Sequence, residues 1–372
     1  MHISLHRPWL WRLSVAAALV AALGSTGATA ADNASPQLDL FERPALRSNL
    51  ADRSLMLSVT QAGERLVAVG ERGFILISED HGVSWQQVDS PVSVTLTRVR
   101  FATAFDGWAV GHAGVVLHSR DGGFTWTRQL DGVAAAQLAL AAAQAAPAEH
   151  AEGQLAEAQR LVEDGPDKPF LNLHFFDAQR GIVVGAYGLA FATEDGGTSW
   201  KSISARLDNP SALHLYDILE LEGALFIAGE QGLMLRSTDG GVSFQALETP
   251  AGGTLFGMVA TGPNSLIAFG LRGKAYRSDD LGATWQALPN RQSTTITAGT
   301  RLSSGELVLV DETGSLQLSR DGGRSFQVLP IPESGFLSSV SELPDGQLVV
   351  SSNRGVIRIA QEDLNRSTGR EQ

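Results

Sequence analysis

The sequence predicts an all-β fold, a seven-bladed β-propeller made of four-stranded antiparallel blades, and three observations support this prediction. The first is a short box, [ST]-x-D-x-G-x-[ST]-[WF], which occurs six times along the chain. The second is a turn of the form Gly-x-x-Gly that comes just before each box. The third is the spacing, because both markers return in phase with a period of roughly 40–50 residues, which is typical of propeller blades.

The boxes are predicted to hold the fold together. Their aspartates are Asp80, Asp121, Asp195, Asp239, Asp280 and Asp321. A short acidic side chain accepts hydrogen bonds from the amides of its own turn, and the Ser or Thr hydroxyls can bond neighbouring backbone groups. The Trp or Phe that closes each box begins the outer strand, and we expect its ring to be buried against the next blade.

The glycine turns set the number of blades. Their last glycine recurs at Gly73, Gly114, Gly188, Gly232, Gly273, Gly314 and Gly355, which gives seven repeats. The copies at residues 311–314 and 352–355 lack the first glycine. Glycine suits such turns because it reaches positive φ without a Cβ clash.

The last repeat is incomplete. The first repeat reads as four strands, at residues 55–60, 65–70, 74–78 and 85–89. The seventh reads as three strands, at residues 336–341, 347–351 and 356–360, and it ends without a box. We expect a strand at residues 38–46 to fill the vacant position and close the ring, which would remove two exposed sheet edges.

A segment inserted between the second and third blades explains the single long interval, from Asp121 to Asp195. Residues 131–168 are rich in Ala, Gln and Glu, and they read as two helices, at residues 133–146 and 148–163, broken at Pro147. Leu155, Ala158, Leu161 and Val162 form a narrow apolar stripe at helical spacing. The insert is expected either to pack on the propeller as a helical hairpin or to serve as an arm that docks a partner.

The first 30 residues have the pattern of a secretory signal peptide. Arg7 and Arg12 supply positive charge, residues 13–23 are an apolar run too short to cross a bilayer, and Ala28-Thr29-Ala30 is a cleavage site. We therefore expect a single propeller of residues 31–372 in a bacterial periplasm, as a monomer that does not span the membrane. The sequence has no cysteine, so we expect neither disulfides nor a lipid-modified cysteine.

Candidate binding residues come from the middle of the glycine turns, because all these turns lie on one face of a propeller. Arg72, Arg272 and Arg354 share one turn position with Tyr187, and His112 precedes that position in the second repeat. Guanidinium groups bind carboxylates through two parallel hydrogen bonds, so these five residues are predicted to bind a partner. The alternative is that the arginines form ion pairs with Glu71, Glu230 and Glu312 of the same turns.

The sequence argues against several other functions. A net charge of −12 argues against nucleic acid and anionic membrane surfaces as partners. The histidines are scattered without metal-ligand spacing, and no glycine-rich loop joins a strand to a helix, so neither a metal nor a cofactor is expected. The boxes resemble those of sialidases, but the catalytic Tyr–Glu pair and arginine triad of that family are not recognisable, and we expect no enzyme.

The paired markers resemble those of the Ycf48/Hcf136 family of photosystem II assembly factors. The resemblance rests on Leu66-Val67-Ala68-Val69-Gly70-Glu71-Arg72-Gly73 followed by the first box, and on Gly107-Trp108-Ala109-Val110-Gly111-His112 followed by the second. It covers about residues 38 to 360. It implies a non-enzymatic, translocated propeller that binds a photosystem II reaction-centre subunit where one exists, through an arginine-rich face matched here by Arg72, Arg272 and Arg354.

The sequence therefore leaves two possible functions. The first is an exported scaffold that binds a membrane or envelope protein and assists its assembly or stability. The second is a glycan-directed propeller, either a sialidase-like hydrolase or a carbohydrate-binding protein. The Ala-rich insert and the lack of a lipidation cysteine differ from many cyanobacterial members, and the signal and composition are of proteobacterial type.

Overall fold

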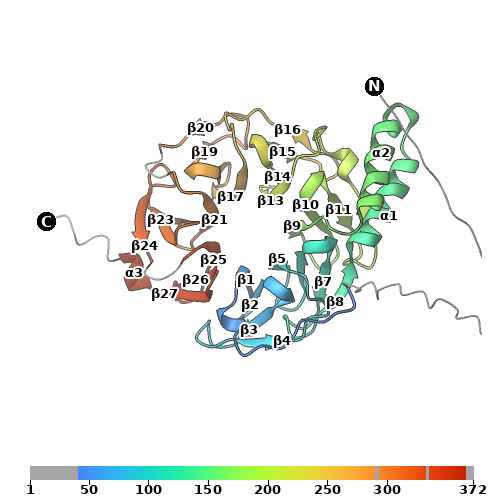
Figure 1. The fold of residues 1–372 in the computed structure, drawn as a ribbon. Coiled ribbons are helices and arrows are strands. Elements are labelled where there is room, and N and C mark those ends of the chain that lie inside the picture. The colour runs from blue at the N-terminus through green and yellow to red at the C-terminus, as the bar shows by residue number, and fades with distance from the viewer. Residues whose placement is uncertain (1–40, 290–292, 332–334, 366–372) are drawn as a thin grey trace, which may run out of the picture. The chain divides into compact units, whose positions relative to one another are not determined.

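The protein is a ring of seven antiparallel sheets around a central opening (Figure 1). The structure, a computed structural model, describes residues 41–289, 293–331 and 335–365, which lie within one compact unit. In each sheet the strands follow one another in chain order, and the first strand of each blade lies at the centre of the ring. The predicted seven-bladed propeller is confirmed.

The blades contain the following strands. Blade 1 is β1 (Met56–Ala62), β2 (Arg65–Gly70), β3 (Ile75–Ser78) and β4 (Gln86–Val88). Blade 2 is β5 (Leu96–Phe101), β6 (Gly107–Gly111), β7 (Val116–Ser119) and β8 (Thr127–Leu130). Blade 3 is β9 (Phe170–Phe175), β10 (Gly181–Gly185), β11 (Ala190–Thr193) and β12 (Lys201–Ser202). Blade 4 is β13 (Leu215–Leu221), β14 (Ala224–Gly229), β15 (Met234–Ser237) and β16 (Gln245–Ala246). Blade 5 is β17 (Leu255–Gly262), β18 (Ser265–Gly270), β19 (Ala275–Ser278) and β20 (Gln286–Ala287). Blade 6 is β21 (Ile296–Arg301), β22 (Leu307–Asp311), β23 (Ser315–Ser319) and β24 (Gln327–Pro330). Blade 7 is β25 (Leu337–Glu342), β26 (Leu348–Ser352) and β27 (Gly355–Ile359).

The hydrophobic core is divided among the blade interfaces. The described residues form seven apolar clusters, and each cluster joins two neighbouring blades. The second strand of each blade carries a near-continuous apolar run, since both of its faces pack against neighbours. The interface between blades 2 and 3 contains Trp108, which is fully buried.

The box aspartates bond within their own turns, as the sequence predicted. In the second box, Asp121 Oδ1 accepts hydrogen bonds from the Ser119 hydroxyl at 2.8 Å and from the Thr125 amide at 3.0 Å. Its Oδ2 accepts from the Thr125 hydroxyl at 2.6 Å, and the Ser119 oxygen accepts from the Gly123 amide at 2.8 Å. The same four bonds recur in the other boxes, so the aspartates stabilise the turn between the third and fourth strands.

One detail of the box prediction is wrong. The closing aromatic ring packs against the preceding blade rather than the next one. Trp126 of blade 2 belongs to the cluster shared with blade 1, and Trp200 of blade 3 belongs to the cluster shared with blade 2. The reason lies in the box itself, since its second glycine approaches the preceding blade, as Gly123 approaches Val67, and the aromatic residue follows on that side.

The box carboxylates make the stability of the fold depend on pH. The hydroxyl of Ser243, the hydroxyl of Ser237 and the Ser243 amide hold the pKa of Asp239 well below its usual value. A carboxyl whose pKa is lowered by folding adds stability above its unfolded pKa, about 4, and loses that contribution as the pH falls toward the folded value. Asp239→Asn is expected to cost about 1–2 kcal/mol at pH 7. Urea unfolding at pH 7 and pH 3 should show a smaller acid-induced loss in the variant than in the wild type, and an equal loss would contradict this role.

The glycine turns share one backbone shape in five blades. The turns η2 (Glu71–Gly73), η3 (His112–Gly114), η4 (Ala186–Gly188), η6 (Glu230–Gly232) and η7 (Leu271–Gly273) are short 3₁₀ turns. Their middle residues, among them Arg72 and Tyr187, are left-handed with φ of 56° and 55°. A Cβ on the last glycine, Gly73, would overlap the carbonyl of Val92, where the chain crosses to the next blade. Among the described residues, Thr313 and Arg354 do not have positive φ, so the degenerate turns of blades 6 and 7 differ in shape.

The predicted closing strand is wrong over its described part. Residues 41–54 contain no strand, and residues 38–40 lie outside the described residues. The segment lies instead along the outer strand of blade 1, where the Ala45 amide donates to Ser90 O at 3.1 Å and Gln87 bonds both the Ser48 amide and Leu46 O at 2.9 Å. Blade 7 consequently has three strands among the described residues.

The ring is joined between blades 7 and 1 by other contacts. The turn η1 (Ala51–Arg53) lies beside β27, where a Cβ on Gly355 would overlap the Asp52 carbonyl, as a Cβ on Gly73 would overlap that of Val92. The Ser338 hydroxyl donates to Met56 O at 2.7 Å, and the Gln61 side chain donates to Glu342 O. The N-terminal segment thus takes the place of a linker between blades, and side chains bond the two innermost strands.

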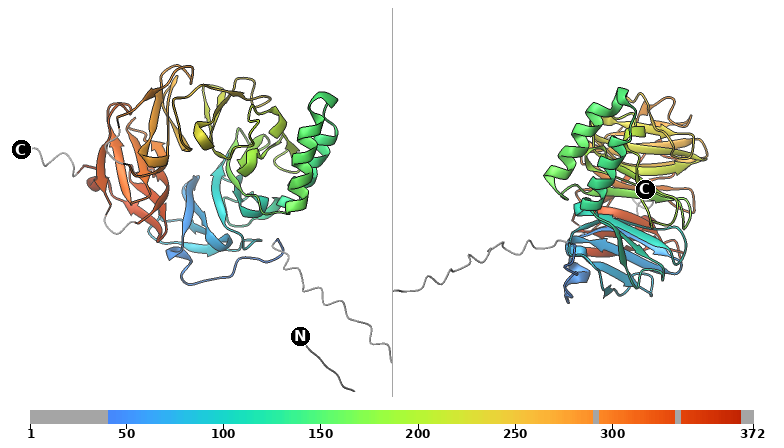
Figure 2. Two further views of the ribbon diagram at one scale, coloured as in Figure 1. Left: turned by 45° about the horizontal axis from the view of Figure 1, so that its top comes forward. Right: turned by 90° about the vertical axis from the view of Figure 1, so that its right-hand side faces the viewer.

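The insert forms the two helices that the sequence predicted. These are α1 (Gly132–Gln144), capped by Asp131, and α2 (Ala148–Asp164), which begins after Pro147. Leu138, Ala139 and Leu161 pack on the cluster between blades 2 and 3, and Figure 2 shows both helices at the rim of the ring. The hairpin therefore packs on the propeller, while its use as a docking arm stays a prediction.

A third, short helix follows the last strand. It is α3 (Gln361–Asn365), and its Leu364 is buried in the cluster between blades 6 and 7. None of the helices in the described ranges is long and apolar enough to cross a membrane.

Candidate functional site

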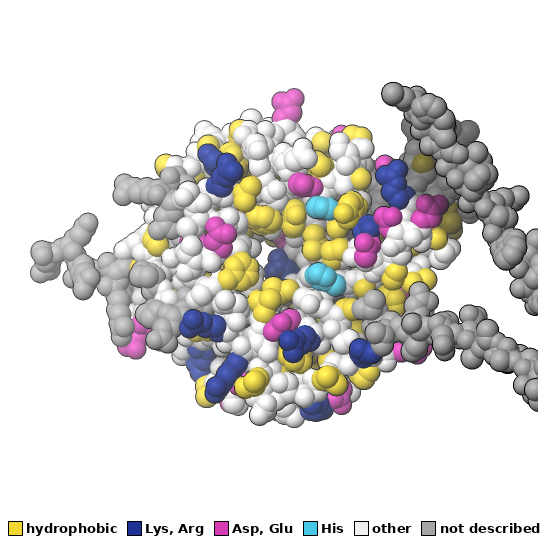
Figure 3. Space-filling view, viewed as in Figure 1, with side chains coloured by type: hydrophobic (Ala, Val, Ile, Leu, Met, Phe, Trp, Pro, Cys, Tyr) yellow, Lys and Arg dark blue, Asp and Glu magenta, His cyan; other side chains and the backbone are white. Residues whose placement is uncertain are grey.

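The first candidate surface is the glycine-turn face, which we define as the face formed by the turns between the second and third strands. Arg72, Arg272 and Arg354 are exposed in these turns, and Tyr187 is 56% exposed. His112 lies in the equivalent turn of blade 2, where its amide donates to Thr95 O at 2.8 Å. Basic, acidic and apolar side chains surround the central opening in Figure 3. The five predicted residues therefore share one face but belong to five different blades.

The glutamates of these turns do not form the ring of ion pairs that the sequence offered as an alternative. The carboxylates of Glu71, Glu230 and Glu312 accept hydrogen bonds from the amides of Leu55, His214 and Thr295, at 3.2, 3.4 and 2.8 Å. Each carboxylate thus bonds the start of the innermost strand of its own blade. The ion pairs of the described residues include neither Arg72 nor Arg272, so these two guanidinium groups can face a partner.

Tyr187 belongs to a small aromatic group that the sequence did not reveal. Its amide donates to His214 Nδ1 at 2.9 Å, and its ring meets the His214 ring edge-on at 4.7 Å. Lys168, from the end of the insert, lies 5.1 Å from the centre of the tyrosine ring. Tyr216 and Phe256 continue the aromatic contacts toward the centre of the ring. Because these residues come from three blades and the insert, spacing along the chain provided no signal for the group.

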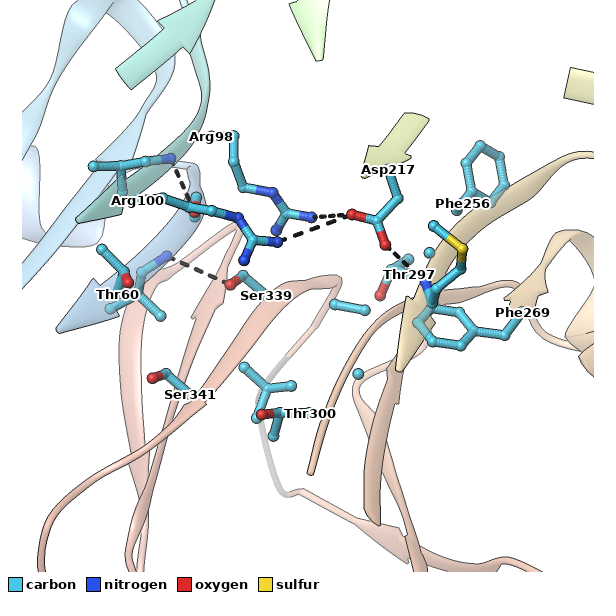
Figure 4. Close-up of a pocket in the computed structure, with 18 residues that line it drawn as sticks. Thr60, Arg98, Arg100, Asp217, Phe256, Phe269, Thr297, Thr300, Ser339 and Ser341 are labelled. Atoms are coloured by element: carbon cyan, nitrogen blue, oxygen red, sulfur yellow. Dashed lines mark hydrogen bonds and ion pairs between the residues drawn. The ribbon is translucent and has the colours of Figure 1, made fainter. Parts of the chain in front are cut away.

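The second candidate site is a cavity of about 210 Å³ in the central channel, which we call the channel site. It is lined by the innermost strands β1, β5, β13, β17, β21 and β25. Arg98 and Arg100 enter it from β5, and Asp217 enters it from β13 (Figure 4). This site was not predicted from the sequence.

Strand register explains how the channel site is built. In each blade, one residue of the innermost strand follows a bulge and pairs with the second-to-last residue of the second strand. At this level the seven blades carry, in order, Ser58, Arg98, Asn172, Asp217, Gly257, Ala298 and Ser339. Blades 2 to 4 thus carry large polar side chains at this level, whereas the small glycine and alanine of blades 5 and 6 leave room for the cavity.

Two hydrogen bonds fix the carboxylate of Asp217 in place. Its Oδ2 accepts a hydrogen bond from the Met258 amide at 2.7 Å, and its Oδ1 accepts from Asn172 Nδ2 at 2.7 Å. The Arg98 and Arg100 guanidinium nitrogens lie 3.8 and 4.0 Å from Oδ1. Burial raises the pKa of Asp217, while both arginines act in the opposite direction.

The channel site carries positive charge at neutral pH. Burial, together with Arg100, lowers the pKa of Arg98 to about 10, so Arg98 keeps its proton at pH 7. Burial and Arg100 likewise hold the pKa of the neighbouring His174 at about 4, so its imidazole is neutral. Two guanidinium groups therefore face one carboxylate, and the site can attract an anion.

Comparison with known proteins assigns the chain to a family. The sequence profile described as "Photosynthesis system II assembly factor YCF48" matches residues 48–149 and 153–371. The chain belongs to the YCF48 family. The matched ranges contain all six boxes and all seven glycine turns, and the match confirms the resemblance drawn from the sequence.

Individual proteins of the YCF48 family align with only part of this chain. The chain is 32% identical, over 144 residues, to the photosystem II assembly protein Ycf48 of Synechococcus sp. (strain JA-2-3B'a(2-13)). That alignment spans 34% of this chain and 42% of the relative, so the chain matches less than half of that relative's length.

Solved structures share the fold. The structure titled "YCF48 bound to D1 peptide" has a TM-score of 0.61 at 17% identity, over 85% of this chain and 98% of the other. A GH74 enzyme of Niastella koreensis has a TM-score of 0.60 at 11% identity, over 83% of this chain and 52% of the other. At these identities the likeness shows only a common propeller architecture.

The described residues contain no group of three or more His, Asp or Glu side chains that could hold a metal ion.

Proposed function

We propose that this YCF48-family protein is an exported, non-enzymatic propeller that binds a membrane-protein partner and assists its assembly or stability. The observation that carries the proposal is the family match, which runs through all seven blades. By resemblance, the partner is a photosystem II reaction-centre subunit in an organism that has one. A relative of the same fold has been solved with a D1 peptide, which fits a propeller that binds a segment of such a subunit.

The proposed location is the bacterial periplasm. Residues 1–30 supply the features of a secretory signal peptide, with Arg7 and Arg12 ahead of an apolar run and a small-residue cleavage site at Ala28-Thr29-Ala30. The propeller of residues 31–372 would then act on the parts of membrane proteins that reach this compartment. The net charge of −12 favours protein partners over anionic lipid.

The proposed partner surface is the glycine-turn face. Arg72, Arg272 and Arg354 are exposed there, and Tyr187 offers an aromatic ring that is more than half exposed. Exposed Arg and Tyr side chains are enriched at the energetic centres of protein interfaces. His112 lies on the same face, between Arg72 and Tyr187 in blade order.

The channel site supports a binding role over glycoside hydrolysis. Its lining contains a single carboxylate, that of Asp217, and no tyrosine or glutamate. Glycosidases use two carboxyl groups at a defined separation, and a sialidase-like reaction needs a Tyr–Glu pair. The alternative of a sialidase-like or carbohydrate-binding propeller therefore rests on the shared fold and the boxes, and the channel lining lacks the groups for such hydrolysis.

The proposal is tested by recovery of partners from membranes. The tagged protein is mixed with detergent-solubilised envelope from its own host, and bound proteins are identified by mass spectrometry. The triple variant Arg72→Ala, Arg272→Ala and Arg354→Ala is expected to lose the membrane-protein partners. Alanine is tolerated at the positions of Arg72 and Arg272, because Ala113 has the same left-handed backbone in blade 2, and Arg354 does not have positive φ.

A matched triple variant controls for the loss of charge. Arg120→Ala, Lys201→Ala and Arg324→Ala remove three positive charges from exposed positions in or just after the boxes, on the other face. This variant should recover the same partners as the wild type. Equal recovery by the glycine-turn variant would exclude the arginine surface, and turnover of sialosides or β-glucan oligosaccharides that Arg272→Ala abolishes would exclude a non-enzymatic role.

A further inference from the structure

We propose that the channel site binds a small carboxylate group, which Arg98 and Arg100 hold together with the hydroxyls of Thr60, Thr300 and Ser341. This inference goes beyond the partner surface on the glycine-turn face, because it concerns different residues, inside the ring. The ligand is defined by its chemistry as a carboxylate on a body small enough for the cavity.

The first argument is unused hydrogen-bonding capacity. Each guanidinium carries five N–H donors in a planar fork. Asp217 lies 3.8 and 4.0 Å away, beyond hydrogen-bonding distance, and its oxygens already accept bonds from Met258 and Asn172. Arg100 Nε is buried without a partner among the described residues. Buried donors in this state are costly, and a ligand that accepts from them gains correspondingly.

The second argument is charge. One carboxylate offsets at most one of the two guanidinium groups, so the site keeps at least one positive charge at pH 7. His174 is held neutral beside them and adds no charge. A single carboxylate from a ligand would restore neutrality, and Arg forks bind carboxylates through two parallel bonds.

The third argument is shape. Gly257 and Ala298 line the cavity at the level where other blades carry longer side chains. The volume of about 210 Å³ equals the liquid volume of roughly seven water molecules, which suits a small acid or the last residue of a peptide. Met258 and Phe269 also line the cavity, but both are almost fully buried, so the surface offered to a ligand is mainly polar.

The hydroxyls complete the site. Figure 4 shows both guanidinium groups turned toward Asp217, with Thr60 beside Arg100 and with Ser341 and Thr300 farther from the arginines. Among the described residues these three hydroxyls have no hydrogen-bond partner, whereas Ser58 and Ser339 accept from the amides of Val99 and Val59. Thr60, Thr300 and Ser341 are therefore able to donate to a carboxylate that the arginines hold.

Binding is measured by isothermal titration calorimetry at low salt on the full chain. The probes are 4-methylpentanoate, a leucine-ending tetrapeptide with a free C-terminus, the same peptide amidated, and inorganic phosphate. We expect the free peptide, the small acid, or both to bind, and the amidated peptide and phosphate not to bind. Binding of the small acid alone identifies a free metabolite-like acid, and stronger binding of the free peptide identifies a chain terminus.

Two variants test the geometry. Arg100→Gln is expected to weaken carboxylate binding at least about tenfold, the loss of one charge-assisted bond. Ala298→Leu should fill the cavity and abolish binding while all charges remain. Arg120→Gln, on the exposed box of blade 2, removes the same charge and should bind like the wild type.

The outcomes are decisive once circular dichroism and melting curves show that the variants are folded. The proposal is overturned if the wild type binds none of the carboxylates, if phosphate or the amidated peptide binds equally well, or if both channel variants bind like the wild type. Partner recovery with Arg100→Gln separates the two proposals, because retained membrane partners with lost carboxylate binding would show that the channel acts independently of the glycine-turn face.

Discussion

Asp217→Ala is expected to lower the free energy of unfolding by about 3–5 kcal/mol, the usual cost of removing one partner of a buried ion pair. The carboxylate is nearly buried, at 6% side-chain exposure, and both Arg98 and Arg100 approach its Oδ1. Its loss leaves two guanidinium groups to repel each other and deprives the Met258 amide and Asn172 Nδ2 of their acceptor. Urea unfolding at pH 7, followed by tryptophan fluorescence, measures the change.

Asp217→Asn is the matched control for this prediction. The amide oxygen can still accept from the Met258 amide, whereas the negative charge is gone, so an intermediate loss of stability is expected. If Asp217→Ala costs less than about 1 kcal/mol, Asp217 does not hold the charges of the channel together, and the charge balance inferred for the channel site is wrong.

Trp108→Ala is expected to cost about 3–5 kcal/mol, which is typical for truncation of a large buried aromatic side chain. Trp108 is fully buried at the interface of blades 2 and 3. Its ring stacks between Phe175, at 3.6 Å between centroids, and His118, at 4.4 Å. Its Nε1 donates to Gln129 Oε1 at 3.1 Å, so truncation removes packing and also leaves an acceptor without its donor. Thermal and urea unfolding at pH 7 test the prediction.

Trp108→Phe is the control for packing. Phe226 occupies the equivalent position in blade 4, so a phenyl ring fits this place in a blade. We expect a loss of about 1–2 kcal/mol, since the smaller ring leaves a partial cavity and gives up the bond to Gln129. Equal losses for Trp108→Phe and Trp108→Ala would mean that the hydrogen bond, rather than burial of the ring, dominates at this position.

The fold was predictable because two markers recur in phase. The box and the glycine turn each fix one loop of a blade, and together they place four strands without reference to distant contacts. The helical insert was also predictable, since Pro147 and the Ala-rich composition act locally. The position of the box aromatic ring against the preceding blade was not, because it depends on how neighbouring blades pack.

The closing strand failed for a related reason. A short segment such as residues 38–46 carries no information about whether it will pair with blade 7 or lie along blade 1. The side chain of Gln87 decides this for the described residues by bonding the backbone at Leu46 and Ser48. That contact joins residues about 40 positions apart in a region without a repeat marker.

The candidate sites, like the fold, were predictable from the sequence only in part. The sequence placed Arg72, Arg272 and Arg354 on one face because they belong to the repeated turn. It suggested the wrong partners for the glutamates of these turns, whose carboxylates bond backbone amides instead. The channel site was missed because only the bulged strand register brings Arg98 and Asp217 to one level. The signal present in the sequence was the pair Arg98 and Arg100, two charges at alternate positions of an innermost strand.

The left-handed middle residue of the glycine turn also bears on how such proteins diversify. Arginine, alanine, tyrosine and glutamine all occupy this position with φ between 55° and 57°. Single substitutions there exchange one chemistry for another while the polypeptide path stays the same. Propellers that descend from one ancestor can therefore acquire new binding specificities by point mutation at this position, while the scaffold that presents these residues stays the same.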